Sequence, residues 1–184
     1  MLAVEPRSAV TVTPSRYRTI VADPPWHWPK GYGYGRNGEL PYPTMNLGEI
    51  CELPVSDMAD QSAHLYLWAT NETLRYAFSV VGAWGFTFRS VIVWCKPLGL
   101  GGHWRNSCEF VLFGDRGKNE ITRRDVPTWH KWANPPAHSQ KPEAFLDLVE
   151  EVSPGPYLEL FARRNRLGWD TWGNESFDHL EVPA

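Results

Sequence analysis

The sequence predicts one α/β domain, in which helices cover the faces of a mostly parallel β-sheet. Strand-like segments alternate with helix-like segments along the chain, which is the pattern of such a sheet. The 184 residues are 42% apolar and 21% charged, a balance typical of a globular protein with a sizeable core. No internal repeat or composition break marks a second domain. We therefore expect a single domain over residues 17–184, preceded by a loose polar arm at residues 1–16.

The predicted strands are short apolar runs rich in β-branched and aromatic residues. They lie at residues 17–22, 63–70, 87–96, 109–113 and 157–162. The first is followed by Asp23, and ligands of open α/β sheets bind beyond the carboxyl ends of such strands. Asp23 is therefore the first candidate for a functional residue.

Three segments between the strands have helical features. Residues 46–53 form a short candidate that Pro54 ends. Asn71 is placed to cap a second helix, whose apolar residues recur at Leu74, Ala77, Phe78 and Val81 and which ends near Gly82 or Gly85. Ser139 is placed to cap a third, with Pro142 in its first turn and an apolar face of Phe145, Leu146, Val149 and Val152.

The remaining segments are expected to be loops. Residues 27–43 hold four glycines and three prolines, and residues 114–138 form the longest predicted connection. Loops of that length in compact domains are usually functional. The tail, residues 168–175, is predicted to be rich in turns.

Charge and cysteine content limit the class of protein. The formal net charge is −3, which argues against binding nucleic acid through bulk charge. A local basic path is still open, because residues 116–131 hold five Lys or Arg against two acids; solvated loops are the plainer explanation. The three separated cysteines indicate neither a metal site nor a disulfide framework. Without a signal peptide or a bilayer-length apolar run, a cytoplasmic protein is expected.

The segment Asp23-Pro24-Pro25-Trp26 has a chemistry of its own. The carboxylate of Asp23 and the carbonyl of Pro24 are two acceptors, and the prolines fix their direction because φ is locked. Two such acceptors suit the two N–H donors of a planar amino group, and Trp26 offers a flat face for stacking. Accepting those hydrogen bonds would favour attack by the amine nitrogen. The alternative is a strand that ends in a proline turn, with Trp26 in the core.

Several ordered blocks make the chain resemble a known family, the N6-adenine methyltransferases that include the catalytic subunit of the eukaryotic mRNA adenosine methyltransferase. The blocks span residues 17–175 and are 21–26, 40–45, 65–68, 84–86, 93–96, 102–106 with Glu109, 139–143, 159–163 and 172–175. Each block is weak alone, whereas their joint order is specific. The resemblance implies a Rossmann-like, S-adenosylmethionine-dependent fold, circularly permuted so that the catalytic motif precedes the cofactor-donor motif.

The resemblance also implies roles for individual residues. Asp23, Pro24, Pro25 and Trp26 would hold the target base. The cofactor would be bound by Asp23, Lys141, Phe161, Arg163, Asn165, Asn174 and Glu175, with Lys141 at its methionine end and the last two at the ribose. The substrate would be contacted by Tyr42, Pro43, His103, Trp104, Arg123 and Arg124. No metal is implied.

The chain departs from the family pattern at one point. Where the eukaryotic enzyme's pattern has a His-Asn pair after the arginine of the last strand, this chain has Arg164, Asn165 and Arg166. Contacts at the ribose or at the target's phosphates are therefore expected to differ. Three tryptophans within regular elements, Trp68, Trp84 and Trp94, are expected in the core, and no role is assigned to Trp129, Trp132 or Trp169.

The leading hypothesis is a methyltransferase that modifies N6 of adenine in nucleic acid, with DNA favoured over RNA. It requires no membrane and is compatible with a homodimer or a heterodimer. One alternative is a non-catalytic partner of a methyltransferase, against which the intact Asp23 motif argues. Another is a different acceptor amine, such as N4 of cytosine or a protein amide, which the four-residue motif alone leaves open.

Overall fold

The sheet at the centre of the molecule confirms the predicted α/β class. The computed structural model describes residues 17–27, 43–99, 103–118, 120–135 and 140–173. Their strands are β1 (Tyr17–Ala22), β2 (Ala59–Ala69), β3 (Thr87–Cys95), β4 (Cys108–Arg116), β5 (Trp129–His130), β6 (Tyr157–Leu160) and β7 (Trp169–Trp172). They form one seven-stranded sheet in the order β5-β3-β4-β2-β1-β6-β7. All neighbouring pairs are parallel except those of β4, which runs antiparallel to β2 and to β3.

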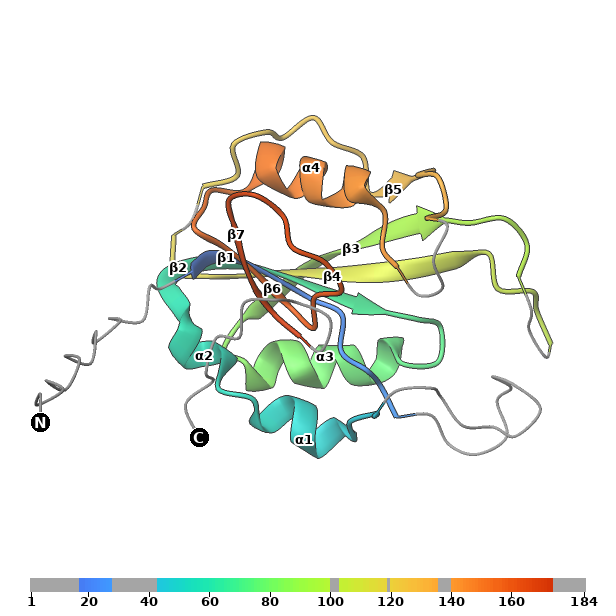
Figure 1. The fold of residues 1–184 in the computed structure, drawn as a ribbon, viewed down its shortest axis with the longest axis horizontal. Helices are drawn as coiled ribbons and strands as arrows, with labels where there is room; N and C mark the ends of the chain where they lie inside the picture. The colour runs from blue at the N-terminus through green and yellow to red at the C-terminus, as the bar shows by residue number, and fades with distance from the viewer. Residues whose placement is uncertain (1–16, 28–42, 100–102, 119, 136–139, 174–184) are drawn as a thin grey trace, which may run out of the picture.

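Helices lie on both faces of this sheet (Figure 1). The helices are α1 (Leu47–Glu52), α2 (Val55–Met58), α3 (Leu74–Ala83) and α4 (Glu143–Val152). Helices α1 and α3 lie together on one face, and α4 lies alone on the other (Figure 1). Alternation along β2 divides the core between them: Leu65 and Leu67 join the cluster under α3, whereas Tyr66 and Trp68 join Phe145 of α4.

Local signals explain two of the helix boundaries. Asn46 and Glu49 form the capping box of α1, in which each side chain accepts a hydrogen bond from the other's backbone N–H. The α3 prediction placed the cap wrongly at Asn71. The Asn71 amide instead donates to Oδ1 of Asn106 at 2.9 Å, and Thr73 occupies the position before the helix.

Other boundaries differ because they depend on partners that are distant in the sequence. Strand β4 continues to Arg116, since β2 and β3 pair with it on both sides, and the short β5 lies within the predicted 114–138 loop because it pairs with β3. The predicted turn-rich tail contains β7, which pairs with β6 and buries Trp169 and Thr171. Helix α4 starts at Glu143, so Pro142 precedes it instead of lying in its first turn.

The predicted core tryptophans are confirmed: Trp68, Trp84 and Trp94 are at most 2% exposed. The three cysteines are free thiols, as their spacing predicted. Among the described residues, no helix is both long and apolar enough to cross a membrane. The arm at residues 1–16 lies outside the described residues, as does Ser139.

Candidate active site at the carboxyl end of β1

Asp23 lies where β1 leaves the sheet, between the carboxyl ends of β2 and β6. The last residue of β1, Ala22, pairs with Leu67 on one side and Leu160 on the other. Thr19, Ile20, Val21 and Ala22 are all buried, so the strand is fixed on both faces. The backbone N–H of Asp23 still donates to the carbonyl of Leu160 at 3.4 Å. The side chain therefore emerges at a rigid, central position of the sheet edge where ligands of α/β proteins bind.

The two prolines after Asp23 turn the chain sharply. The carbonyl of Pro24 accepts the Trp26 N–H at 2.8 Å, and the carbonyl of Pro25 accepts the Met45 N–H at 2.8 Å. A second bond, from the His27 N–H to the Met45 carbonyl, ties the segment to the start of α1. A carbonyl oxygen has two lone pairs, so Pro24 keeps acceptor capacity.

Trp26 packs mainly into the core. Its side chain is 7% exposed and belongs to the cluster on the α1 and α3 face. Its indole N–H donates to the carbonyl of Trp68 at 3.2 Å. Trp26 therefore anchors the turn, and its stacking on a target base stays a prediction.

Lys141 reaches Asp23 from the segment before α4. Its Nζ lies 2.8 Å from Oδ2 of Asp23 and 3.4 Å from Oε2 of Glu109. A second lysine, Lys96, lies 2.5 Å from the other oxygen of Glu109. Acids and lysines thus alternate in the order Asp23, Lys141, Glu109 and Lys96. The side chain of Lys141 is only 15% exposed.

This network fixes the charges at the site. Burial alone would lower the pKa of Lys141, but the carboxylates of Asp23 and Glu109 outweigh it and raise the pKa. Burial alone would raise the pKa of Glu109, but Lys141 and Lys96 outweigh it and lower the pKa. Lys141 also lies 5.1 Å from the centre of the Trp68 ring, a cation–π contact. Lys141 is therefore a fixed cation, and Glu109 a fixed anion, near neutral pH.

Glu159 of β6 is the exception among the acids. Burial raises its pKa to about 7; Arg164 opposes the rise, and the charge of Asp23 adds to it. Its Oε2 is buried and has no hydrogen-bond partner among the described residues. Arg164 is engaged only in part: its Nε lies 2.7 Å from Glu143 as an ion pair and its Nη1 donates to the Lys141 carbonyl at 3.2 Å, whereas its Nη2 is buried and also has no hydrogen-bond partner among the described residues. A buried, unpartnered carboxyl oxygen indicates a place where a donor or a cation can bind.

The chain after β6 has an unusual backbone. Phe161 has a φ of 63°, a left-handed conformation rare for a bulky residue, and its ring contacts that of Trp172. Gly173 is required beside it, because a Cβ there would lie 2.4 Å from the carbonyl oxygen of Ala162. Strain of this kind concentrates at ligand sites. Phe161, predicted to bind the cofactor, is thus held at the carboxyl end of β6, next to that of β1.

The other predicted cofactor residues are placed less directly. Arg163 is half-buried in the same turn. Asn165 is exposed, and its Oδ1 accepts a hydrogen bond from the Thr171 hydroxyl at 3.2 Å. Asn174 and Glu175 lie outside the described residues, so their roles stay predictions.

The predicted substrate residues fall into two places. His103 and Trp104 lie in the connection from β3 to β4, which leaves and re-enters the sheet at the same edge as Asp23; Trp104 is 87% exposed. Pro43 is exposed near Met45, and Tyr42 lies outside the described residues. These positions suit the rim of a site, and their contacts with a substrate stay predictions.

Arg123 and Arg124 are at the other end of α4. The neighbouring Thr122 N–H donates to the carbonyl of Val152, the last residue of the helix, whereas Lys141 precedes its first. Ten helical residues span about 15 Å. Arg123 pairs with Asp125 and Glu151, and Arg124 has no partner among the described residues. The structure therefore does not bring these arginines to Asp23.

Sequence reasoning missed roles for Lys96, Glu109, Glu159 and Arg164. Glu109 and Glu159 had a readable signal, because each is an acid inside an otherwise apolar strand. Acids there are almost always paired or functional. Their partners come from other elements and could not be read from spacing.

Comparison with known proteins identifies the family. A family model described as MT-A70 matches residues 17–175. The chain belongs to the MT-A70 family. The matched range contains every described element and the Asp23, Lys141 and Glu159 positions.

MT-A70 relatives differ in length. The type II methyltransferase M.MunI of Mycoplasma sp is 30% identical over 92% of this chain and 82% of its own length. The human N(6)-adenosine-methyltransferase catalytic subunit METTL3 is 27% identical over 87% of this chain but 28% of its own. A probable N(6)-adenosine-methyltransferase of Oryza sativa subsp. japonica is 31% identical over 87% of this chain and 23% of its own. The chain thus spans about a quarter of these eukaryotic relatives.

Proposed function

We propose that this MT-A70 protein transfers a methyl group from S-adenosylmethionine to N6 of adenine in nucleic acid, with DNA favoured over RNA. The observation that carries the proposal is the Asp23 carboxylate, held at the end of β1 by Lys141 within the region that matches the family. The names of the relatives, N(6)-adenosine-methyltransferases and a type II methyltransferase, support the reaction class.

The charged side chains around Asp23 fit the methionine end of this donor. That end is a zwitterion next to a sulfonium, so it needs both a cation and anions nearby. Lys141 offers the cation for its carboxylate. Asp23 and the unpartnered Oε2 of Glu159 offer negative partners for its positive groups. Phe161 and Arg163 would lie on its adenosine side.

Asp23 would act by accepting hydrogen bonds from the target amine. Lys141 occupies Oδ2, whereas Oδ1 has no partner among the described residues and can accept one N–H. The free lone pair of the Pro24 carbonyl can accept the other. These bonds strengthen as the amine nitrogen becomes positive during attack, so they stabilise the transition state more than the ground state.

The bound donor supplies an electrophilic methyl group on a sulfonium. In the transfer, the amine nitrogen forms a bond to the methyl carbon while the sulfur–carbon bond breaks, and one amine proton is then lost to water. The chain's task is to hold the amine and exclude other orientations. In a duplex, the amino group is paired, so the base must be extruded first.

The preference for DNA rests on the relatives. The chain covers 82% of the type II methyltransferase, whereas it covers about a quarter of those whose names specify adenosine, a ribonucleoside. Cytosine N4 and protein amides present similar N–H donors, so product analysis must separate them.

The test is methyl transfer with labelled S-adenosylmethionine on DNA and RNA of matched sequence, followed by nucleoside analysis. Labelled N6-methyldeoxyadenosine, formed faster than N6-methyladenosine, is the expected product. Label on cytosine or on the protein alone, or no label on either polymer, would refute the proposal.

A further inference from the structure

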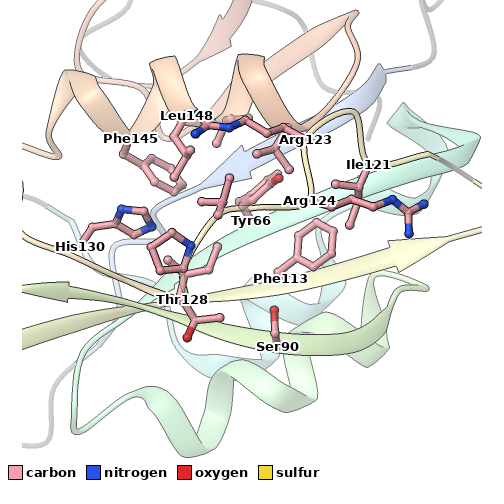
Figure 2. Close-up of a pocket in the computed structure, with 15 residues that line it drawn as sticks. Tyr66, Ser90, Phe113, Ile121, Arg123, Arg124, Thr128, His130, Phe145 and Leu148 are labelled. Atoms are coloured by element: carbon pink, nitrogen blue, oxygen red, sulfur yellow. The ribbon is translucent and has the colours of Figure 1, made fainter.

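A cavity lies on the α4 face of the sheet, and none of its lining residues belongs to the network of Asp23, Lys141 and Glu109. It has a volume of about 260 Å³ and lies between α4, β2, β3, β4 and the segment that leads to β5 (Figure 2). Pockets for drug-sized ligands measure about 300–1,000 Å³, so this one, named the His130 pocket, suits a single small ring system.

The walls of the His130 pocket suit a flat ring. Tyr66, Phe113 and Phe145 present aromatic side chains, and Ile92 and Val149 add aliphatic surface. Figure 2 shows the three aromatic side chains in the cavity wall, with Ser90 on the β3 side. Aromatic walls bind nucleobases through stacking, whatever the base.

His130 contributes an unused hydrogen-bond acceptor. Its ring stacks on Trp132 with centroids 4.4 Å apart and planes 5° apart, which fixes its orientation. Burial lowers its pKa, and a hydrogen bond to the backbone of Pro127 opposes that shift. Proline has only a carbonyl to offer, so the imidazole donates this bond. Nε2 is buried without a partner among the described residues, which leaves Nδ1 as the donor and Nε2 as a free acceptor.

Two arginines line the pocket, and only one of them is paired with acids. Arg123 is neutralised by Asp125 and Glu151. Arg124 has no partner in the described part of the chain, and it lies at the opposite end of the pocket from His130 (Figure 2). A ligand that satisfies both ends needs an N–H donor on a flat ring and an anionic group beyond it.

We propose that the His130 pocket binds a second nucleotide, whose base donates an N–H to Nε2 of His130 and whose phosphate faces Arg124. Adenine and cytosine meet the requirement through their amino groups. Because it is separate from the Asp23 site, this pocket would bind a nucleotide other than the one that is methylated. The assignment of this nucleotide to the substrate strand rests on the proposed function. The binding of a nucleotide by the pocket does not.

The test uses adenosine 5′-monophosphate, with the cofactor site filled by S-adenosylhomocysteine. The imidazole NMR signal of His130, assigned with His130→Phe, should shift on binding. Purine riboside 5′-monophosphate, which lacks the amino group, should bind about 10-fold more weakly to the wild type. In His130→Phe, which keeps the ring, the two nucleotides should bind equally. Equal affinities in the wild type, or no shift of the His130 signal, would overturn the proposal.

Two further variants test the rest of the pocket. Arg124→Ala should weaken nucleotide binding and reduce its salt dependence, whereas Arg75→Ala, which removes an exposed arginine from α3 on the opposite face, should not. Ser90→Phe should fill the cavity and abolish binding while the far-ultraviolet circular dichroism stays unchanged. If Ser90→Phe instead changes the oligomeric state without affecting nucleotide binding, a second copy of the chain covers the pocket and the proposal is wrong.

A single-stranded oligonucleotide separates the two sources of the nucleotide. Weaker strand binding by His130→Phe assigns the pocket to the substrate strand, and an effect confined to the mononucleotide assigns it to a free nucleotide. If no polymer is methylated but the His130 effect persists, the proposed function fails and the pocket stands. If adenine is methylated and His130→Phe changes no affinity, the pocket alone fails.

Discussion

The start of α4 and the face that the helix turns to the sheet border different surroundings. Before its first residue, Lys141 joins Asp23 and Glu109 in a network in which each buried charge has an opposite partner. Along the rest of its length, from Phe145 to Val152, the helix covers an apolar cavity with one imidazole acceptor that has no partner among the described residues. Buried ion networks contribute little net stability, so the first arrangement is better explained by chemistry than by folding. The second arrangement, a cavity with a free acceptor, suits the binding of a ligand.

The largest effect should follow from changing the acid of the Asp23 site. Asp23→Asn keeps the side-chain shape but can turn a donor toward the target N–H. Turnover should fall by roughly 10²–10³-fold, the loss typical of one preorganised electrostatic contact. Steady-state methylation at saturating donor measures it, with Asp57→Asn on the exposed α2 as the matched control.

The next effect concerns cofactor affinity. Lys141→Ala should remove a charge-assisted contact worth about 1.5–3 kcal/mol, or about 10- to 150-fold in affinity for S-adenosylhomocysteine. Calorimetry measures this, and Lys118→Ala, an exposed lysine, is the control. Because Asp23 and Glu109 then lose their shared cation, the variant should also unfold at lower urea. Unchanged affinity in a folded Lys141→Ala variant would show that Lys141 does not contact the cofactor.

Glu159 should make stability depend on pH. Its folded-state pKa of about 7 lies above the usual 4.5, so the unfolded chain releases the proton first as pH rises. The stability of the wild type should therefore fall relative to Glu159→Gln between about pH 4.5 and 7 and then level off, by roughly 3 kcal/mol. Urea unfolding at pH 5 and pH 8 tests the sign. The exposed Glu52→Gln should show no such difference, and a wild type that gains stability over this range would contradict the assignment.

The smallest effect should distinguish the two neighbouring arginines of the His130 pocket. Arg124→Ala should reduce the slope of log affinity against log salt for a nucleic-acid strand by about one unit, the change expected for one lost phosphate contact. Arg123→Ala should change it less, because Asp125 and Glu151 already neutralise that charge. Equal slopes for the wild type and Arg124→Ala would mean that no phosphate lies near this arginine.

The position of Asp23 and Lys141 was largely predictable from the sequence, and the His130 pocket was not. A buried strand followed by Asp23-Pro24-Pro25 locates an acid at a sheet edge, and Pro142 with a periodic apolar face locates α4 and hence Lys141. These are local signals. The pairing of Lys141 with Glu109 depends on β4 lying between β2 and β3, a topology that periodicity does not encode.

The His130 pocket depends even more on distant contacts. Residues 117–118 and 120–128 have no regular structure, and two contacts set the path of this segment: β5 pairs with β3, and the Thr122 N–H donates to the carbonyl of Val152. The functional importance of the predicted loop at residues 114–138 stays a prediction, and residue spacing gave no signal for its short strand or its cavity. The two arginines of this loop differ because Glu151 of α4 pairs with Arg123, whereas Arg124 has no partner among the described residues. Sequence spacing does not show this difference.

The division of labour between the Asp23 site and the His130 pocket can be tested in one titration. Single-turnover methylation of an adenine-containing strand, at saturating donor and increasing protein, gives a limiting rate and a half-saturating concentration for each variant. Asp23→Asn should lower the limiting rate at least 100-fold with little change in half-saturation. His130→Phe should raise the half-saturating concentration and leave the limiting rate near that of the wild type. An Asp23→Asn protein that still methylates adenine at a near wild-type limiting rate would contradict the account, because the acid would then serve only the fold.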